Sequence, residues 1–295
     1  MAQTFDAAAY LGANPDVAKA VGEGRVPSAW SHFVSHGFRE GRAGVPAGVL
    51  ARVEAVMAAS GAAPPARLIS RVHGTSEASG FEQVGRTIAL DVYAAAGPLV
   101  DMDAPLRILD FGCGCGRVLR YMGEVAPRAT FHASDIDAEA IAWCAGNFRG
   151  EVERGRFSFA TNSDHPPTSF RADEFDLVYA ISVFTHLPED LQLEWLGELR
   201  RILRPGGIAL LSTQGGSLIR RHLSPGDARL FEEKGFHYFP YGSTEGLPEY
   251  YQAAWHESTY IDRVWSRTFE ILGQLPGGIA GHQDLIVCRK APGAA

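Results

Sequence analysis

The spacing of apolar residues predicts helices in the first third of the chain and alternating strands and helices after it. Val49, Val53 and Val56 recur at the spacing of one helix face, and the apolar stripe from Leu191 to Leu203 marks a second clear helix. Short apolar runs bounded by turn residues predict strands. The expected strands cover residues about 108–110, 130–133, 157–160, 177–181, 208–213, 268–272 and 284–288.

Glycine and proline clusters divide the chain into three parts. Residues 1–45 hold two short helical patterns and end in a glycine-rich linker. A module this small has little core of its own, so we expect it to dock on the main domain or on a second subunit. Residues 46–105 are expected to form a helical cap, and 106–295 the main domain. At about 215–262 an aromatic-rich insertion is expected to cover the mouth of the site, although the same aromatic residues could form an ordinary small core.

Composition and charge narrow the classes of function. The 295 residues are 46% hydrophobic and 21% charged, with a net charge of −7, which is typical of a soluble globular protein. No block of like charge indicates nucleic acid or a membrane surface as partner. We see no signal peptide, no apolar run long enough for a membrane span and no disulfide framework among the four cysteines, and therefore expect a cytoplasmic protein.

The most informative stretch is a glycine turn between a predicted strand and a predicted helix. Asp110 ends the strand, and Gly112, Gly114 and Gly116 follow at every second position. Glycines allow a sharp turn and a close approach of backbone to ligand, and the helix N-terminus beyond offers free N–H groups. The third glycine comes one residue too early for the dinucleotide fingerprint Gly-x-Gly-x-x-Gly. The turn therefore suits a nucleoside ligand with a polar or charged tail.

This stretch resembles motif I of the class I S-adenosylmethionine-dependent methyltransferases, and further landmarks of that superfamily follow in order over about 105–215. The resemblance implies an α/β fold with a Rossmann-like, doubly wound, seven-stranded sheet whose strand 7 is antiparallel. Helical N-terminal additions and an insertion before the last two strands complete it, and S-adenosyl-L-methionine is the implied cofactor. The landmarks are Ile108-Leu109-Asp110-Phe111-Gly112-Cys113-Gly114-Cys115-Gly116, Ser134-Asp135-Ile136-Asp137, the strand around Leu177 to Ser182, and Leu203-Arg204-Pro205-Gly206-Gly207.

An acidic residue after the second strand is expected to hold the cofactor's ribose. Asp135 lies close to the roughly 20 residues beyond the glycine turn at which such a residue occurs, and a carboxylate can accept two hydroxyl hydrogen bonds. Alternatively, Asp135 or Asp137 caps the next helix. The resemblance implies as cofactor-binding residues Asp110, Gly112, Cys113, Gly114, Gly116, Asp135, Ile136 against the adenine, Asn162 and Ser163 near the adenine amino group, and Ser182 near the methyl.

Three histidines are candidates for a catalytic base. A hydroxyl acceptor benefits from a base by about 10²–10⁴-fold. His186 comes first because it follows the strand that ends near the methyl; His256 in the insertion and His282 in the last loop come second and third. Each could equally be an ordinary hydrogen-bonding residue. No metal is expected, because no carboxylate cluster is apparent.

The expected reaction is O-methylation of a hydroxyl on a small molecule such as a sugar, an aromatic compound or a glycosylated metabolite. N-methylation and methylation of a carboxylate, which needs no base, stay open. The other classes are a non-catalytic S-adenosylmethionine-binding scaffold or regulatory protein and a nucleotide-dependent oxidoreductase. A homo-oligomer through residues 1–45 is a further expectation.

Overall fold

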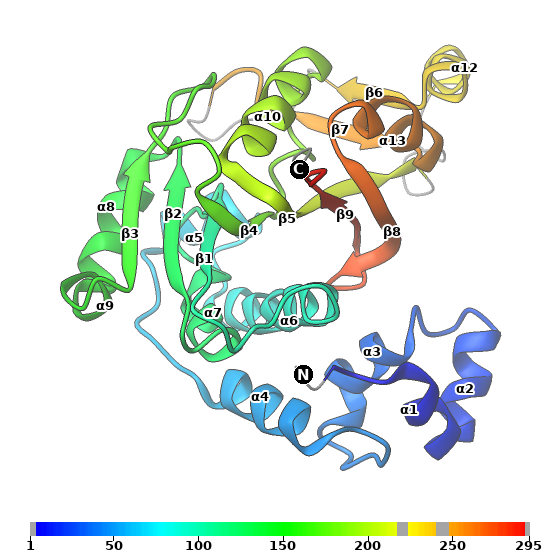
Figure 1. The fold of residues 1–295 in the computed structure, drawn as a ribbon. Coiled ribbons are helices and arrows are strands. Elements are labelled where there is room, and N and C mark those ends of the chain that lie inside the picture. Colours follow the sequence, from blue (N-terminus) through cyan, green and yellow to red (C-terminus); the bar gives the residue numbers. More distant parts are fainter. Residues whose placement is uncertain (1–3, 217–223, 240–247, 293–295) are drawn as a thin grey trace.

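The computed structural model describes residues 4–216, 224–239 and 248–292, which fold around a central, mostly parallel sheet (Figure 1). Five parallel strands lie in the order β3-β2-β1-β4-β5. β9 continues the sheet antiparallel to β5, and β8 pairs with β9. The bounds are β1 (Arg107–Phe111), β2 (Thr130–Asp135), β3 (Phe157–Thr161), β4 (Phe175–Ala180), β5 (Leu203–Gly215), β8 (Glu270–Ile279) and β9 (Gln283–Arg289). This arrangement confirms the predicted doubly wound fold with its antiparallel strand 7.

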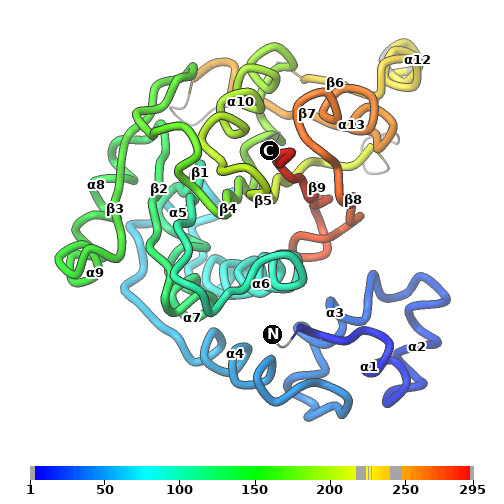
Figure 2. Tube along the Cα trace, in the orientation of Figure 1, coloured from blue at the N-terminus to red at the C-terminus, as the bar shows by residue number. Residues whose placement is uncertain are grey.

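Helices cover both faces of the sheet, because its central strands are apolar on both sides. In β1, Ile108 packs into a core shared with α6 and α7, while its neighbour Leu109 packs into the opposite core with Trp195 of α10. Figures 1 and 2 show α6 and α7 on one side of the sheet and α10 on the other. The helices of this part are α5 (Ala66–His73), α6 (Ala78–Ala96), α7 (Leu119–Val125), α8 (Ala138–Asn147), α9 (Arg149–Glu153) and α10 (Glu189–Ile202).

The segment expected to be an insertion extends the sheet as well as reaching the site. β7 pairs in parallel with the end of β5, and β6 pairs with β7. Phe236 and Tyr260 are buried in the same core as Leu109 and Trp195, which we call the second core. Part of the aromatic cluster therefore packs as core. Residues 217–223 and 240–247 of this segment lie outside the described residues. Its elements are α12 (Pro225–Lys234), β6 (Phe236–Phe239), β7 (Ala253–His256), α13 (Ser258–Val264) and the short 3₁₀ turn Trp265–Arg267.

The N-terminal helices dock on the main domain through a cluster of aromatic rings. Phe33 is buried and packs against Tyr10 and Trp30, and the Trp30 ring lies 6.4 Å from that of Tyr93 on α6. The N-terminal helices therefore dock on the main domain of the same chain, the first of the two arrangements expected from the sequence. No helix among the described residues has the length and apolar character needed to cross a membrane. The helices are α1 (Ala7–Ala13), α2 (Pro15–Gly22), α3 (Ala29–His32) with its π-helical continuation Phe33–Gly37, and α4 (Ala47–Ala58).

Candidate active site

A cavity opens at the carboxyl ends of β1, β2 and β4, where the strand order reverses. Ligands of doubly wound sheets bind at such a switch point. The empty volume is about 1010 Å³, part of it open to solvent. Most of the sequence-predicted site residues come together here, namely Asp110, Gly112, Cys113, Gly114, Asp135, Ile136, Asn162, Ser182 and His186.

The glycine turn needs glycine for both conformation and space. Gly112 and Gly114 have φ angles of 77° and 51°, which favour glycine. A β-carbon on Gly112 would lie 2.2 Å from Val183, and one on Gly114 would lie 2.6 Å from Val72 of α5. Any side chain here would therefore collide with a wall of the cavity. Gly116 lies behind the turn, where a β-carbon would approach Phe148 to 3.1 Å, so it serves the packing of the turn.

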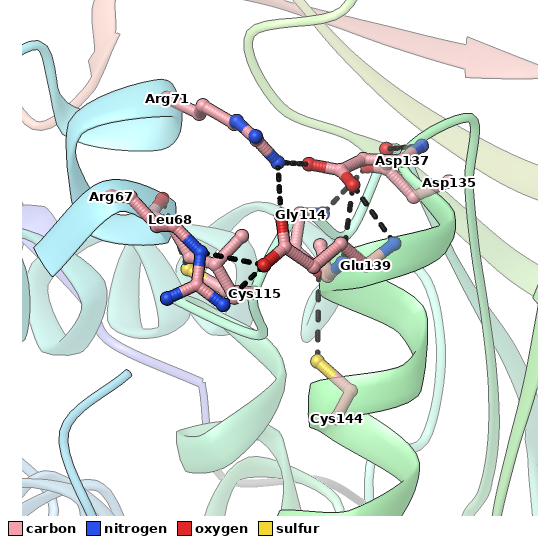
Figure 3. A network of polar contacts seen from close by, with 10 residues as sticks. Arg67, Leu68, Arg71, Gly114, Cys115, Asp135, Asp137, Glu139 and Cys144 are labelled. Carbon is pink, nitrogen blue, oxygen red and sulfur yellow. Dashed lines mark hydrogen bonds and ion pairs between the residues drawn. The ribbon is translucent and has the colours of Figure 1, made fainter. Parts of the chain in front are cut away.

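The structure separates the two aspartates after β2. Asp137 caps α8 by accepting the backbone N–H groups of Glu139 and Ala140, and Arg71 donates to its other oxygen at 2.7 Å (Figure 3). Asp135 instead accepts the N–H of Gly114 at 2.7 Å and that of Asp137 at 2.8 Å. Its carboxylate therefore joins the glycine turn to β2 at the cavity wall. Burial raises the pKa of Asp135 above its ordinary value.

A second carboxyl group lies at the base of the turn. Asp110 is buried at the end of β1 and accepts the Tyr179 hydroxyl at 2.9 Å. Burial raises the pKa of Asp110 to about 7, although the hydrogen bond from Tyr179 opposes the shift. Because a buried negative charge is costly, this group carries a proton more readily than a surface aspartate.

Two buried polar groups at the cavity have unsatisfied atoms. Arg117, only 8% exposed, donates from Nη1 to the Val72 carbonyl at 3.0 Å, but its Nε has no hydrogen-bond partner and no carboxylate pairs with it among the described residues. Burial lowers its pKa. Asn162 donates to the carbonyl of Ser163, and its buried Oδ1 accepts no hydrogen bond within the described part of the chain. Unsatisfied buried groups are costly, so both fit complementary groups on a ligand.

Ser182, just beyond β4, is held from three sides in a left-handed conformation, with φ of 61°. Its N–H donates to the Ser212 hydroxyl at 2.7 Å, and its own hydroxyl accepts from Gln283 at 2.9 Å. Its carbonyl accepts the Tyr251 hydroxyl at 3.2 Å. A strained residue persists only when its surroundings fix it, and these contacts fix Ser182 at the cavity.

His186 lies in the cavity wall in one defined tautomer. Its Nδ1 lies 2.7 Å from the carbonyl oxygen of Gln252, so Nδ1 carries the proton and the neutral ring keeps its lone pair on Nε2. The ring stacks on Tyr251 with centroids 4.3 Å apart. Burial lowers the pKa of His186, which favours the neutral form.

The other two histidines and Ser163 do not line the cavity. His256 is 2% exposed and packs among Phe236, Tyr260 and Trp265 in the second core. This position does not support a role for His256 as base, because the ring cannot reach a ligand in the cavity. His282 is exposed in the β8–β9 turn.

A family model described as a methyltransferase domain matches residues 67–257, about two-thirds of the chain. The chain belongs to this methyltransferase family. S-adenosyl-L-methionine is its cofactor, as the resemblance implied.

Three similar proteins show how far the likeness extends. The malonyl-[acyl-carrier protein] O-methyltransferase of Halalkalibacterium halodurans is 29% identical over 126 residues, which are 38% of this chain and 41% of that protein. The 1,6-didemethyltoxoflavin-N1-methyltransferase of Burkholderia thailandensis, solved with 1,6-didemethyltoxoflavin and S-adenosylhomocysteine, superposes with a TM-score of 0.51 at 17% identity, over 75% of this chain and 84% of that chain. A S-adenosylmethionine-dependent methyltransferase of Methanosarcina mazei gives a TM-score of 0.48 at 19% identity, over 66% and 96%. The toxoflavin enzyme shares the fold of this methyltransferase.

Several cavity residues of the methyltransferase were not singled out from the sequence as binding residues. Arg117 directly follows the glycine turn, and its charge next to an apolar helix start was the available signal. Trp195 belongs to the apolar stripe of α10, which predicts a core position. It packs in the second core and also lines the cavity. Tyr250 and Tyr251 belong to the aromatic cluster of the insertion, and they are the members that reach the cavity.

Proposed function

We propose that this methyltransferase transfers the methyl group of S-adenosyl-L-methionine to a hydroxyl of a small-molecule acceptor, with His186 as general base. The observation that carries the proposal is the state of His186. Its Nδ1–H is committed to Gln252, its pKa is lowered by burial, and it lines the cavity beside Ser182. A neutral imidazole with a free Nε2 is the group that a hydroxyl acceptor requires.

Three side chains are proposed to hold the cofactor. The Asp135 carboxylate accepts the ribose hydroxyls, since its position beside Gly114 places it at the wall next to the glycine turn. The unpaired Oδ1 of Asn162 accepts the adenine amino group. Arg117, a buried cation without a carboxylate partner among the described residues, pairs with the cofactor's carboxylate. Each assignment satisfies a group that is otherwise unpaired or costly in the structure.

The chemistry leaves the protein mainly the tasks of alignment and proton removal. The cofactor's sulfonium supplies the methyl group and a good leaving group when it is bound. The acceptor oxygen must lie roughly 3–3.5 Å from the methyl carbon and in line with the breaking C–S bond. With the donor bound, Nε2 of His186 would accept the hydroxyl proton as the acceptor oxygen gains the methyl group, and the donor would leave as S-adenosylhomocysteine with the C–S electron pair.

Flat side chains line the part of the cavity around His186. Tyr251 stacks on this histidine, Tyr250 lies next to it, and Leu187 and Trp195 add apolar surface. Such walls suit the face of a sugar or aromatic ring. The toxoflavin enzyme is named for N1-methylation of a small molecule, in line with a small acceptor, whereas the malonyl relative is named for O-methylation of malonyl-[acyl-carrier protein].

The test is transfer of labelled methyl from S-adenosylmethionine to a panel of small sugars and phenols. With an accepted substrate, His186→Gln is expected to lower turnover by about 10²–10⁴-fold at pH 7.5 while leaving the affinity for S-adenosylhomocysteine unchanged. Turnover of the wild type should already be at its plateau at neutral pH, because burial lowers the pKa of His186. The exposed His282→Gln serves as the matched control and should keep full turnover. Unchanged turnover in His186→Gln would show that His186 is not the base.

A further inference from the structure

A chain of hydrogen bonds links the N-terminal helices to the cavity through one buried carboxylate. Asp91 lies on α6 and is only 8% exposed. One oxygen accepts the indole N–H of Trp30 from α3 at 3.3 Å, and the other accepts the backbone N–H of Ala280 at 2.7 Å. Asp91 thus joins two segments far apart in sequence, and Figure 1 shows α3 and the β8–β9 turn near α6.

The β8–β9 turn carries this contact on to the site. Ala280 has a φ of 51°, a strained value for a residue with a side chain. The turn ends at Gln283, which pairs with Ile279 across the hairpin and donates to the Ser182 hydroxyl at 2.9 Å. Asp91 therefore holds the strained Ala280 of a turn that leads to Gln283, whose side chain supports Ser182 in the cavity wall.

We propose that Asp91 is a positioning residue for methyl transfer, which holds the β8–β9 turn so that Gln283 fixes Ser182 at the cavity. The N-terminal module takes part by supplying Trp30 as the second donor to Asp91. This inference rests on the proposed function, since it assigns Ser182 to the site that binds cofactor. It gives residues 4–45 a role in ordering the active site.

The chemistry of Asp91 makes this link sensitive to protonation. A carboxylate accepts both N–H groups, whereas the carboxylic acid has one acceptor fewer and a proton to place. Burial raises the pKa of Asp91 to about 7. The described groups that act on this pKa besides burial are the Ala280 amide and the Trp30 indole, neither of which is charged. Asp91→Asn is thus a neutral mimic of the protonated side chain.

The test is amide hydrogen exchange of the full-length protein, followed by mass spectrometry on peptides covering 276–284 and 181–187. At pH 8, Asp91→Asn and Trp30→Phe are expected to raise exchange in both peptides several-fold over wild type. Trp30→Phe keeps an aromatic ring in the cluster and serves if Asp91→Asn does not fold. Glu54→Gln, an exposed acid on α4, is the control and should match wild type. After correction for intrinsic rates, wild type at pH 6 should resemble Asp91→Asn at pH 8, and the variant should change little with pH.

Titration with S-adenosylhomocysteine supplies the second readout. At pH 8 the two variants should bind it several-fold more weakly than wild type and Glu54→Gln. Equal exchange in the 276–284 peptide of wild type and both variants would overturn the inference, as would raised exchange there with no change at 181–187 and unchanged affinity. Absence of S-adenosylhomocysteine binding in the wild type would instead count against the proposed function, and the exchange data would still decide whether Asp91 orders the turn.

Discussion

Burial separates the roles of the histidines. His186 has one ring nitrogen bonded to Gln252 and lies in the cavity wall. His256 is enclosed in the second core, where its Nε2 donates to Gln192 at 2.8 Å. Without a nearby negative charge, burial lowers the pKa of His256 to about 3. The same residue type therefore lines the cavity in one position and packs in the core in the other.

His256 should make the folded state sensitive to acid. Its pKa is about 3 when folded and about 6.5 when unfolded, so the unfolded state binds more protons between these values, and stability falls as pH drops below about 6.5. At pH 5 this corresponds to roughly 2 kcal/mol. In urea unfolding, His256→Leu is expected to lose about 2 kcal/mol less than wild type between pH 7 and pH 5. Equal losses would show that His256 is protonated in the folded state.

At the residue scale, the sequence predicted the positions that follow from spacing along the chain better than those that depend on tertiary packing. The glycines and Asp135 could be placed because their spacing reflects one strand–turn–helix unit. Which of Asp135 and Asp137 caps α8 was left open, because the sequence does not define where β2 ends and α8 begins; β2 ends at Asp135, and Asp137 is the cap. Arg117 was not placed in the cavity, because its burial depends on tertiary packing against Val72.

At the element scale, α5 is clamped over the glycine turn. Arg71 bridges Asp137 and Glu139 of the α8 start at 2.7 and 3.0 Å, and Arg67 adds a second contact to Glu139 (Figure 3). Val72 of the same helix lies so close to Gly114 that a β-carbon on Gly114 would come within 2.6 Å of it. Since Arg71 and Val72 of α5 line the cavity, we expect the clamp to slow the release of a bound cofactor.

Arg71→Ala is expected to speed dissociation of S-adenosylhomocysteine several-fold in stopped-flow measurements, and to weaken the salt dependence of that rate. The loss of stability should stay within about 1 kcal/mol, because the clamp is partly exposed and screened by solvent. Arg67→Ala is the matched control, since the Arg67 side chain is 63% exposed and pairs with Glu139, the more exposed of the two carboxylates. Equal dissociation rates in wild type and Arg71→Ala would mean that α5 is held by its apolar contacts alone.

Most strands and helices of the sheet could be predicted, and the insertion could not. The strands β1 to β5 and the helix α10 could be predicted from apolar runs and stripes, because their buried positions recur at a regular spacing along the sequence. The pairing of β7 with the end of β5 joins Gln214 to Trp255. Such pairing of a four-residue strand with the end of a long one depends on the folded context and leaves no periodic signal. The sequence therefore left the aromatic segment open between a lid and a core; part of it packs as a core, and Tyr250 and Tyr251 line the cavity.

At the scale of the whole molecule, three parts converge on one cavity. The doubly wound sheet supplies the glycine turn, α5 supplies one wall, and the insertion supplies Tyr250 and Tyr251. The N-terminal module docks on α6 from outside through Trp30. The order of strands, and with it the position of the cavity, was predictable because the landmarks follow one another as in the methyltransferase superfamily. The docking of the module was open between two partners until the contact with Tyr93 was seen.

Calorimetric titration of the purified protein with S-adenosylhomocysteine shows directly whether this cavity binds the methyl donor through the glycine turn. Wild type and the control Gly146→Ala, whose added methyl group meets no atom, should bind it. Gly114→Val should bind at least about 100-fold more weakly, because its side chain would fill the space next to Val72 at a positive φ. NAD should not bind any of the three proteins. Retained affinity in a folded Gly114→Val, or binding of NAD in place of S-adenosylhomocysteine, would contradict the placement of the site.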